Sequence, residues 1–170
     1  MKLGQLIDQI SVEHKLPPEV VTAVICRESN GNTFATRWEQ AIFLKVSQRD
    51  RGSLSGFVPR EVVCTVFTEK HLRAFSWGLM QVLGETARVF GLKGDIGQLV
   101  VPAIGIEYGC RVLANKLTVS NGSIEQALLK YNGGGDKSYP DKVKIFIGSS
   151  RALEVRDMEV PLLLASSSLH

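Results

Sequence analysis

The chain has 170 residues, of which 44% are hydrophobic and 22% charged, and these values suit one globular domain with a single core. Its formal charge of +3 suits an anionic polymer such as a cell wall, but it is too small to predict nucleic-acid binding. Its three cysteines have no CxxC spacing and fit neither a disulfide framework nor a zinc site, so we expect no metal and no cofactor.

Two helices are predicted before residue 30. Apolar residues recur at helical spacing from Leu3 to Leu16, which predicts an amphipathic helix at the start of the chain. Pro17-Pro18 ends this helix and begins a second one, because proline is tolerated in a first helical turn. The second helix is apolar for most of its length and gives way to a polar loop just after Glu28.

The rest of the chain predicts further helices. Between residues 30 and 75 the pattern is weaker, with a polar, glycine-containing loop at 47–56 and a helix near 61–72. Beyond residue 80, helix starts are expected near Thr86, Pro102, Ser123 and Tyr139. The pattern fades after about residue 152, so we place one mostly α domain at 1–150 and a partly frayed C-terminal tail at 151–170.

Three short motifs carry candidate chemistry. The first is Glu28-Ser29, at the end of the buried helix. Burial disfavours the charged form of a carboxyl group and raises its pKa, and a carboxyl group that stays protonated near neutral pH can act as the general acid of a glycosidase. The second motif is Gly78-Leu79-Met80-Gln81, and the third is Tyr131-Asn132-Gly133, which precedes the helix at Tyr139-Pro140.

In this order, the three motifs resemble those of the SLT-type lytic transglycosylases, relatives of goose-type lysozyme, over roughly residues 16–147. Residues 37–39 and 76–82 look like those of members found in bacteriophages and prophages. The resemblance implies a lysozyme-like fold with a polysaccharide-binding cleft. It also implies cleavage of the β-1,4 bond between N-acetylmuramic acid and N-acetylglucosamine in peptidoglycan, giving 1,6-anhydromuramic acid ends without water or a cofactor.

The resemblance also implies roles for individual residues. Glu28 matches the glutamate that acts first as general acid and then as base, and Tyr131 matches a tyrosine whose phenol reaches that glutamate. Residues expected to bind or orient the glycan are Ser29, Ser76, Trp77, Gly78, Leu79, Met80, Gln81 and Asn132. A structural role, in loop bonding or core packing, is an open alternative for Ser29, Trp77, Met80 and Gln81. For Asn132 the alternative is that it shapes the helix end beneath the cleft.

Two departures from the commonest pattern, a long segment between Glu28 and Gly78 and a lysine at position 130, leave the glycan preference open. One alternative function is a hydrolytic muramidase on the same fold. It would need a second acid, for which the candidates, each expected at the surface, are Glu39, Glu61 and Glu69. The other alternative is a non-catalytic virion structural protein, against which the intact Glu28 and Tyr131 argue.

The N-terminal stretch at 1–10 contains an acid and lacks the continuous apolar run of a signal peptide. No segment approaches the roughly 20 apolar residues of a membrane span. We therefore expect a monomer that is made in the cytoplasm, does not insert into membranes and does not bind nucleic acid. It would reach the periplasmic cell wall after release through a holin pore, as an endolysin, or as a component of a virion.

Overall fold

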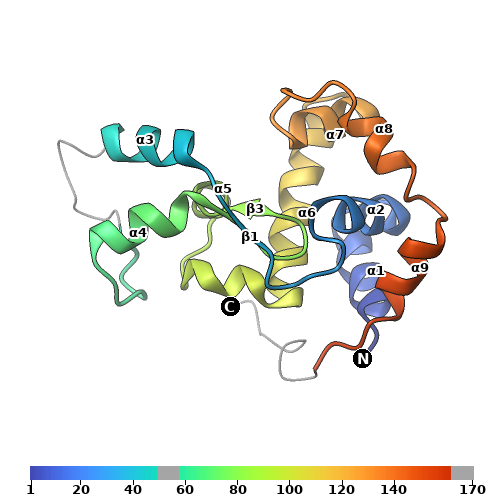
Figure 1. The fold of residues 1–170 in the computed structure, drawn as a ribbon, viewed down its shortest axis with the longest axis horizontal. Helices are drawn as coiled ribbons and strands as arrows, with labels where there is room; N and C mark the ends of the chain where they lie inside the picture. Colours follow the sequence, from blue (N-terminus) through green and yellow to red (C-terminus); the bar gives the residue numbers. More distant parts are fainter. Residues whose placement is uncertain (50–57, 162–170) are drawn as a thin grey trace.

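Helices dominate residues 1–49 and 58–161, the part of the chain that the computed structural model describes (Figure 1). The helices are α1 (Leu3–Glu13), α2 (Pro18–Ser29), α3 (Gln40–Arg49), α4 (Val66–Arg73), α5 (Gly84–Val89), the 3₁₀ helix η1 (Ile96–Val100), α6 (Pro102–Thr118), α7 (Ile124–Tyr131), α8 (Tyr139–Lys144) and α9 (Ser150–Asp157). The predicted mostly α single domain is confirmed. None of these described helices is both long and apolar enough to cross a bilayer.

A small sheet joins the two sides of the molecule. Its strands are β1 (Thr36–Trp38), β2 (Phe75–Trp77) and β3 (Val82–Leu83), which pair antiparallel in that order. In Figure 1 the sheet lies between α3 and α4 on the left and the helices α1, α2, α8 and α9 on the right. The sequence did not predict these strands, because each has only two or three residues and so no readable alternation.

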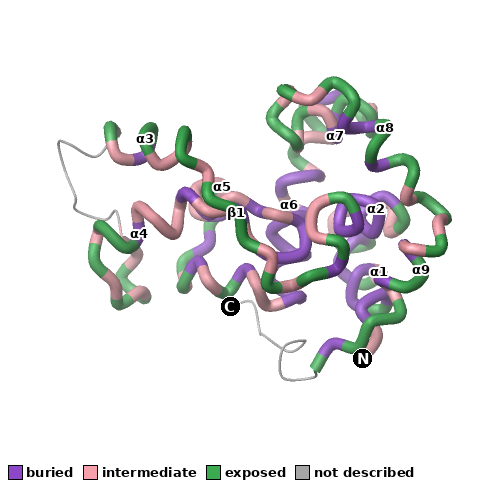
Figure 2. The backbone as a smooth tube through the Cα atoms, in the orientation of Figure 1, coloured by how far each residue is buried: buried purple, intermediate pink, exposed green. Residues whose placement is uncertain are grey.

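The core surrounds α2, which packs against α1, α8 and α9. Apart from Thr22, the central turns of α2 carry small and medium apolar residues, and Val21, Val24 and Ile25 have no exposed surface. Figure 2 shows this buried backbone in α1, α2 and α6, while α3 and α4 are more exposed. Because α2 is enclosed by its neighbours, its C-terminal end, which carries Glu28, is held in a fixed place.

The C-terminal residues belong to the core beyond the predicted boundary at 150. Instead of starting a frayed tail, residues 150–157 form α9, which packs against α1 and α2. Val155 is fully buried, and the Val160 amide donates a hydrogen bond to the Met1 carbonyl at 2.9 Å. The rest of the predicted tail, residues 162–170, lies outside the described residues.

The long segment before residue 78 contains α3 and α4. The helix predicted near 61–72 is α4, and the predicted loop at 47–56 begins inside α3 and then leaves the described residues. Glu69 of α4, expected at the surface, has no exposed surface and accepts hydrogen bonds from Arg73 at 2.9 Å and Arg88 at 2.7 Å. Burial alone would raise the pKa of Glu69, but these arginines outweigh it and lower the pKa.

Candidate active site

Glu28 lines a cleft with a volume of about 380 Å³. Helix α2 ends directly after it, because Asn30 adopts a left-handed conformation (φ of 54°) and Gly31 follows with a φ of 82°. The walls of the cleft come from β1, β2 and α3 on one side and from α6 and α7 on the other. The half-buried carboxyl group therefore faces a space that is large enough for a ligand.

Tyr139 holds the carboxyl group of Glu28. Its hydroxyl group donates a hydrogen bond to Glu28 Oε1 at 2.5 Å, and its side chain, at the start of α8, is 1% exposed. Burial and the negative charge of Glu28 raise the pKa of Tyr139. The phenol therefore stays protonated and remains a donor at neutral pH.

The environment of Glu28 favours its protonated form, as the sequence predicted. Burial raises the pKa of the carboxyl group above its usual value of 4.5. This effect outweighs the Tyr139 hydrogen bond and the positive charges of Arg37 and Arg27, all of which lower the pKa. The negative charge of Glu39 raises it slightly further.

Tyr131 does not make the predicted hydrogen bond to Glu28. It lines the cleft, but its hydroxyl group donates to the Met80 carbonyl at 2.8 Å. The tyrosine that bonds the glutamate is Tyr139, which the sequence reading treated only as a helix start. The pair Tyr139-Pro140, just after the third motif, was the available signal, but it gave no indication of where that phenol would point.

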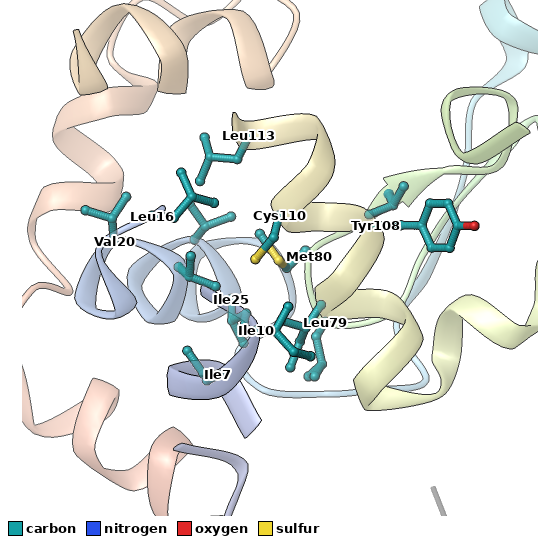
Figure 3. Close-up of a cluster of buried hydrophobic side chains, with 14 of the residues drawn as sticks. Ile7, Ile10, Leu16, Val20, Ile25, Leu79, Met80, Tyr108, Cys110 and Leu113 are labelled. Atoms are coloured by element: carbon teal, nitrogen blue, oxygen red, sulfur yellow. The ribbon is translucent and has the colours of Figure 1, made fainter. Parts of the chain in front are cut away.

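The second motif is mainly a scaffold that the first and third motifs hold through its backbone. The Ser29 hydroxyl donates to the Leu79 carbonyl at 2.8 Å, next to the carbonyl that Tyr131 bonds. Leu79 and Met80 are buried in the core cluster (Figure 3) and do not line the cleft. Their position supports core packing, the alternative that the sequence reading left open for Met80.

Glycine is required at position 78. Its φ is +68°, and a Cβ atom there would lie 2.3 Å from the Leu99 carbonyl oxygen. The motif ends at Gln81, whose side-chain amide donates to the carbonyls of Ala35 at 2.9 Å and Gly78 at 3.0 Å while it also lines the cleft. Gly78 thus serves the close approach of η1, whereas Gln81 both holds the turn and faces the cleft.

The sheet separates a polar face from an aromatic face. Arg37, Glu39 and Ser76 line the cleft, whereas Trp77, next to Ser76 on β2, points the other way and donates its indole N–H to the Leu72 carbonyl at 3.0 Å. The predicted contribution of Trp77 to glycan binding therefore finds no support in this cleft. Trp38, likewise on the aromatic face, packs on Phe75 with ring centroids 5.1 Å apart.

Of the three candidate second acids, Glu39 is the one that lines the cleft of Glu28. It accepts hydrogen bonds from Arg37 at 2.6 Å and from Ser76 at 3.3 Å. Glu61 is exposed and borders a separate surface depression, and Glu69 is the buried partner of Arg73 and Arg88.

Several residues that line the cleft were not predicted. Asn132 does line it, as expected, but so do Arg37 and Lys116, and the apolar wall includes Ile42 and Val112. These residues belong to no motif, and their helices and strands face the cleft only because of the tertiary packing. Among the described residues there is no group of three or more His, Cys, Asp or Glu side chains that would hold a metal ion.

Comparison with known families decides the class of this protein. A family model for the transglycosylase SLT domain matches residues 5–142, most of the chain and all three motifs. The chain belongs to the transglycosylase SLT family. This SLT domain is therefore a lytic transglycosylase that acts on peptidoglycan, in agreement with the resemblance seen in the motifs. Neither a curated protein nor a solved structure shows a significant match to the chain.

Proposed function

We propose that this SLT domain cleaves the β-1,4 bond between N-acetylmuramic acid and N-acetylglucosamine, with Glu28 as the group that transfers protons. The observation that carries the proposal is the position of Glu28, half-buried at the cleft with a raised pKa and a hydrogen bond from Tyr139. A carboxyl group that is protonated at working pH and faces the ligand space is suited to protonate a leaving oxygen.

The proposed reaction returns Glu28 to its starting state. The protonated carboxyl group gives its proton to the glycosidic oxygen while the bond from that oxygen to C1 of muramic acid breaks. The resulting carboxylate then takes the proton of the C6 hydroxyl group of the same sugar, whose oxygen forms the new bond to C1. Tyr139 stabilises the transient carboxylate, because a hydrogen bond to an ionised acceptor is stronger than one to a neutral acceptor.

The test is mass spectrometry of the muropeptides released from purified peptidoglycan. The wild-type chain should release 1,6-anhydromuramic ends, which are lighter by one water than reducing ends. The variant Glu28→Gln should release none, although it folds, while Glu13→Gln, at an exposed site without a bonded partner among the described residues, should match the wild type. Wild-type rates of release from folded Glu28→Gln would refute the assignment.

Glu39 supports a second candidate, a hydrolytic muramidase on the same fold. It lines the same cleft and accepts hydrogen bonds from Arg37 and Ser76, which supports a role in orienting a water molecule toward C1. Reducing ends among the products, lost in Glu39→Gln, would establish this activity. Anhydromuramic ends alone, released equally by Glu39→Gln and the wild type, would exclude it.

We also propose that the enzyme acts on the bacterial cell wall as a phage or prophage protein, either released through a holin pore or carried in a virion. The phage-like residues 37–39 and 76–82 support this proposal. Co-expression with a holin should cause lysis that expression of the chain alone does not. Equal lysis with and without the holin would contradict the holin-dependent route.

A further inference from the structure

Two lysine side chains occupy one wall of the cleft. Lys116 of α6 and Lys130 of α7 line the same space as Glu28. Lys116 is half-buried, and its side chain makes no hydrogen bond or ion pair with another described residue. The Lys130 ammonium group donates one hydrogen bond to the Val119 carbonyl at 2.7 Å, which leaves two of its three N–H donors for a ligand.

The charges of these lysines are not balanced within the cleft. On the opposite wall, Arg37 and Glu39 neutralise each other across 2.6 Å. Glu28 is held toward its uncharged form. The described residues of the cleft therefore present two ammonium groups, both from α6 and α7, without a carboxylate to pair with them.

An alternating glycan of N-acetylglucosamine and N-acetylmuramic acid is neutral except at its muramic acids. Each muramic acid carries a lactyl substituent that ends either in a carboxylate or in an attached peptide, which has carboxylates of its own. An ammonium group binds a carboxylate through charge-assisted hydrogen bonds, which are the stronger ones. The acidic substituent of muramic acid is thus the part of the polymer that matches this wall.

We propose that Lys116 and Lys130 form a carboxylate-binding subsite that recognises the acidic substituent of muramic acid. The subsite deepens the proposed function and rests on it, because it assumes that the cleft holds peptidoglycan. It makes the enzyme prefer strands whose muramic acids carry free carboxylates. Partly exposed ion pairs contribute only modestly to the free energy of binding. The two lysines together should therefore strengthen binding about three- to tenfold at low salt.

The test measures binding in the Glu28→Gln background, so that the glycan is not consumed. Three soluble strands are compared: peptide-bearing, bare with free lactyl carboxylates, and peptide-bearing with amines acetylated and carboxylates converted to methylamides. Lys116→Gln/Lys130→Gln should weaken binding about three- to tenfold for at least one of the two strands that keep their carboxylates. Lys93→Gln, the same charge change at an exposed site outside the cleft, should not weaken it.

The pattern of losses identifies the carboxylate. A loss on the bare strand alone assigns the lactyl carboxylate, and a loss on the peptide-bearing strand alone assigns the peptide carboxylates. A loss on both strands shows that the subsite accepts either carboxylate. In each case the loss should disappear on the amidated strand and shrink as salt is raised. Unchanged affinity in the double variant, an equal loss on the amidated strand, or no binding of any strand overturns the proposal.

Two further comparisons distinguish a loss of carboxylate binding from a folding defect and from a failure of catalysis. Lys130→Gln removes the bond to Val119, so Lys116→Gln alone provides a second variant in which no such contact is lost. Since binding is measured without turnover, a failed subsite appears as unchanged affinity. A failed catalytic proposal appears instead as the absence of anhydromuramic ends from the wild-type chain.

Discussion

Glu28 lies where folding and catalysis make opposite demands on one carboxyl group. Burial raises its pKa above 4.5, so the folded state holds the proton at pH values where the unfolded state has released it. Stability is therefore fully present below about pH 4.5 and falls as pH rises through the folded pKa. The group that the reaction needs destabilises the fold at neutral and alkaline pH.

Replacing Glu28 with the uncharged Gln should remove this pH-dependent loss. The melting temperature of Glu28→Gln should exceed that of the wild type by roughly 1–3 °C near pH 8. The difference should narrow as the pH is lowered to about 4. Differential scanning calorimetry across this range measures it, with Glu13→Gln as the exposed control. A difference in melting temperature that does not change with pH would show that ionisation of the Glu28 carboxyl group does not destabilise the folded protein.

Tyr139→Phe should change the pH dependence of turnover as well as its rate. The hydroxyl group stabilises the Glu28 carboxylate, so its loss raises the pKa of Glu28 further and moves the alkaline limb of kcat/KM to higher pH. The maximal rate should fall about tenfold or more, the scale of a hydrogen bond to a charged group.

Tyr131→Phe is the matched comparison for Tyr139→Phe. Its hydroxyl group bonds the Met80 carbonyl, so its loss should reduce turnover less than Glu28→Gln does and leave the alkaline limb in place. Equal shifts of that limb in both phenylalanine variants would refute the separate roles of the two tyrosines.

The contrast between these tyrosines shows what the sequence could predict at the site. The raised pKa of Glu28 follows from a local pattern, an apolar helix that ends in a polar loop. The partner of Glu28 depends instead on how α8 packs against α2, between residues 111 positions apart. The position of Trp77 was likewise unpredictable, because a three-residue strand gives no alternation to show which face each side chain takes.

At the scale of elements, α4 is joined to α5 by a buried charge cluster. Glu69→Ala would leave Arg73 and Arg88 without the carboxylate that both contact. We expect a loss of about 3–5 kcal/mol in the free energy of unfolding, because the buried charge of Arg88 loses its carboxylate, whereas Arg73 keeps its ion pair with Glu85 at 3.2 Å. Urea denaturation measures it, with the exposed Glu61→Ala as control. A loss below about 1 kcal/mol would show that the cluster is not effectively buried.

Some elements were predictable and others were not, for reasons visible in their residues. Helix α2 was clear because its apolar residues are nearly continuous. Helix α9 was missed because only Ala152 and Val155 among its residues are buried. Two buried residues are too few to show the periodicity of an amphipathic helix. Glu69 was expected at the surface because a glutamate in an amphipathic helix usually is, and its arginine partner Arg88 is 19 residues away.

At the scale of the whole molecule, the SLT match ends at residue 142 but the fold does not. A chain cut at the sequence-predicted boundary, residues 1–150, would lose α9 and expose the surface of α1 and α2 that it covers. Compared with residues 1–161, we expect it to lose about 3–6 kcal/mol, given the burial of Val155 and Val160. That is much of the stability of a typical domain.

Thermal denaturation of the two truncated chains, 1–150 and 1–161, tests this expectation. The shorter chain should melt at least about 6 °C lower, since about 1 kcal/mol corresponds to 2–4 °C at this size. Equal melting temperatures would mean that α9 adds no stability to the domain and that the domain boundary lies at residue 150.

Ser29 and Tyr131 hold the second motif through the carbonyl oxygens of Leu79 and Met80. Every amino acid offers the same carbonyl, so these bonds do not depend on which side chains stand at the two positions. Sequences can therefore drift at 79 and 80 among apolar residues of similar volume without disturbing the wall of the cleft. Two members of the family that share neither residue can still present their glutamates to a glycan in the same geometry.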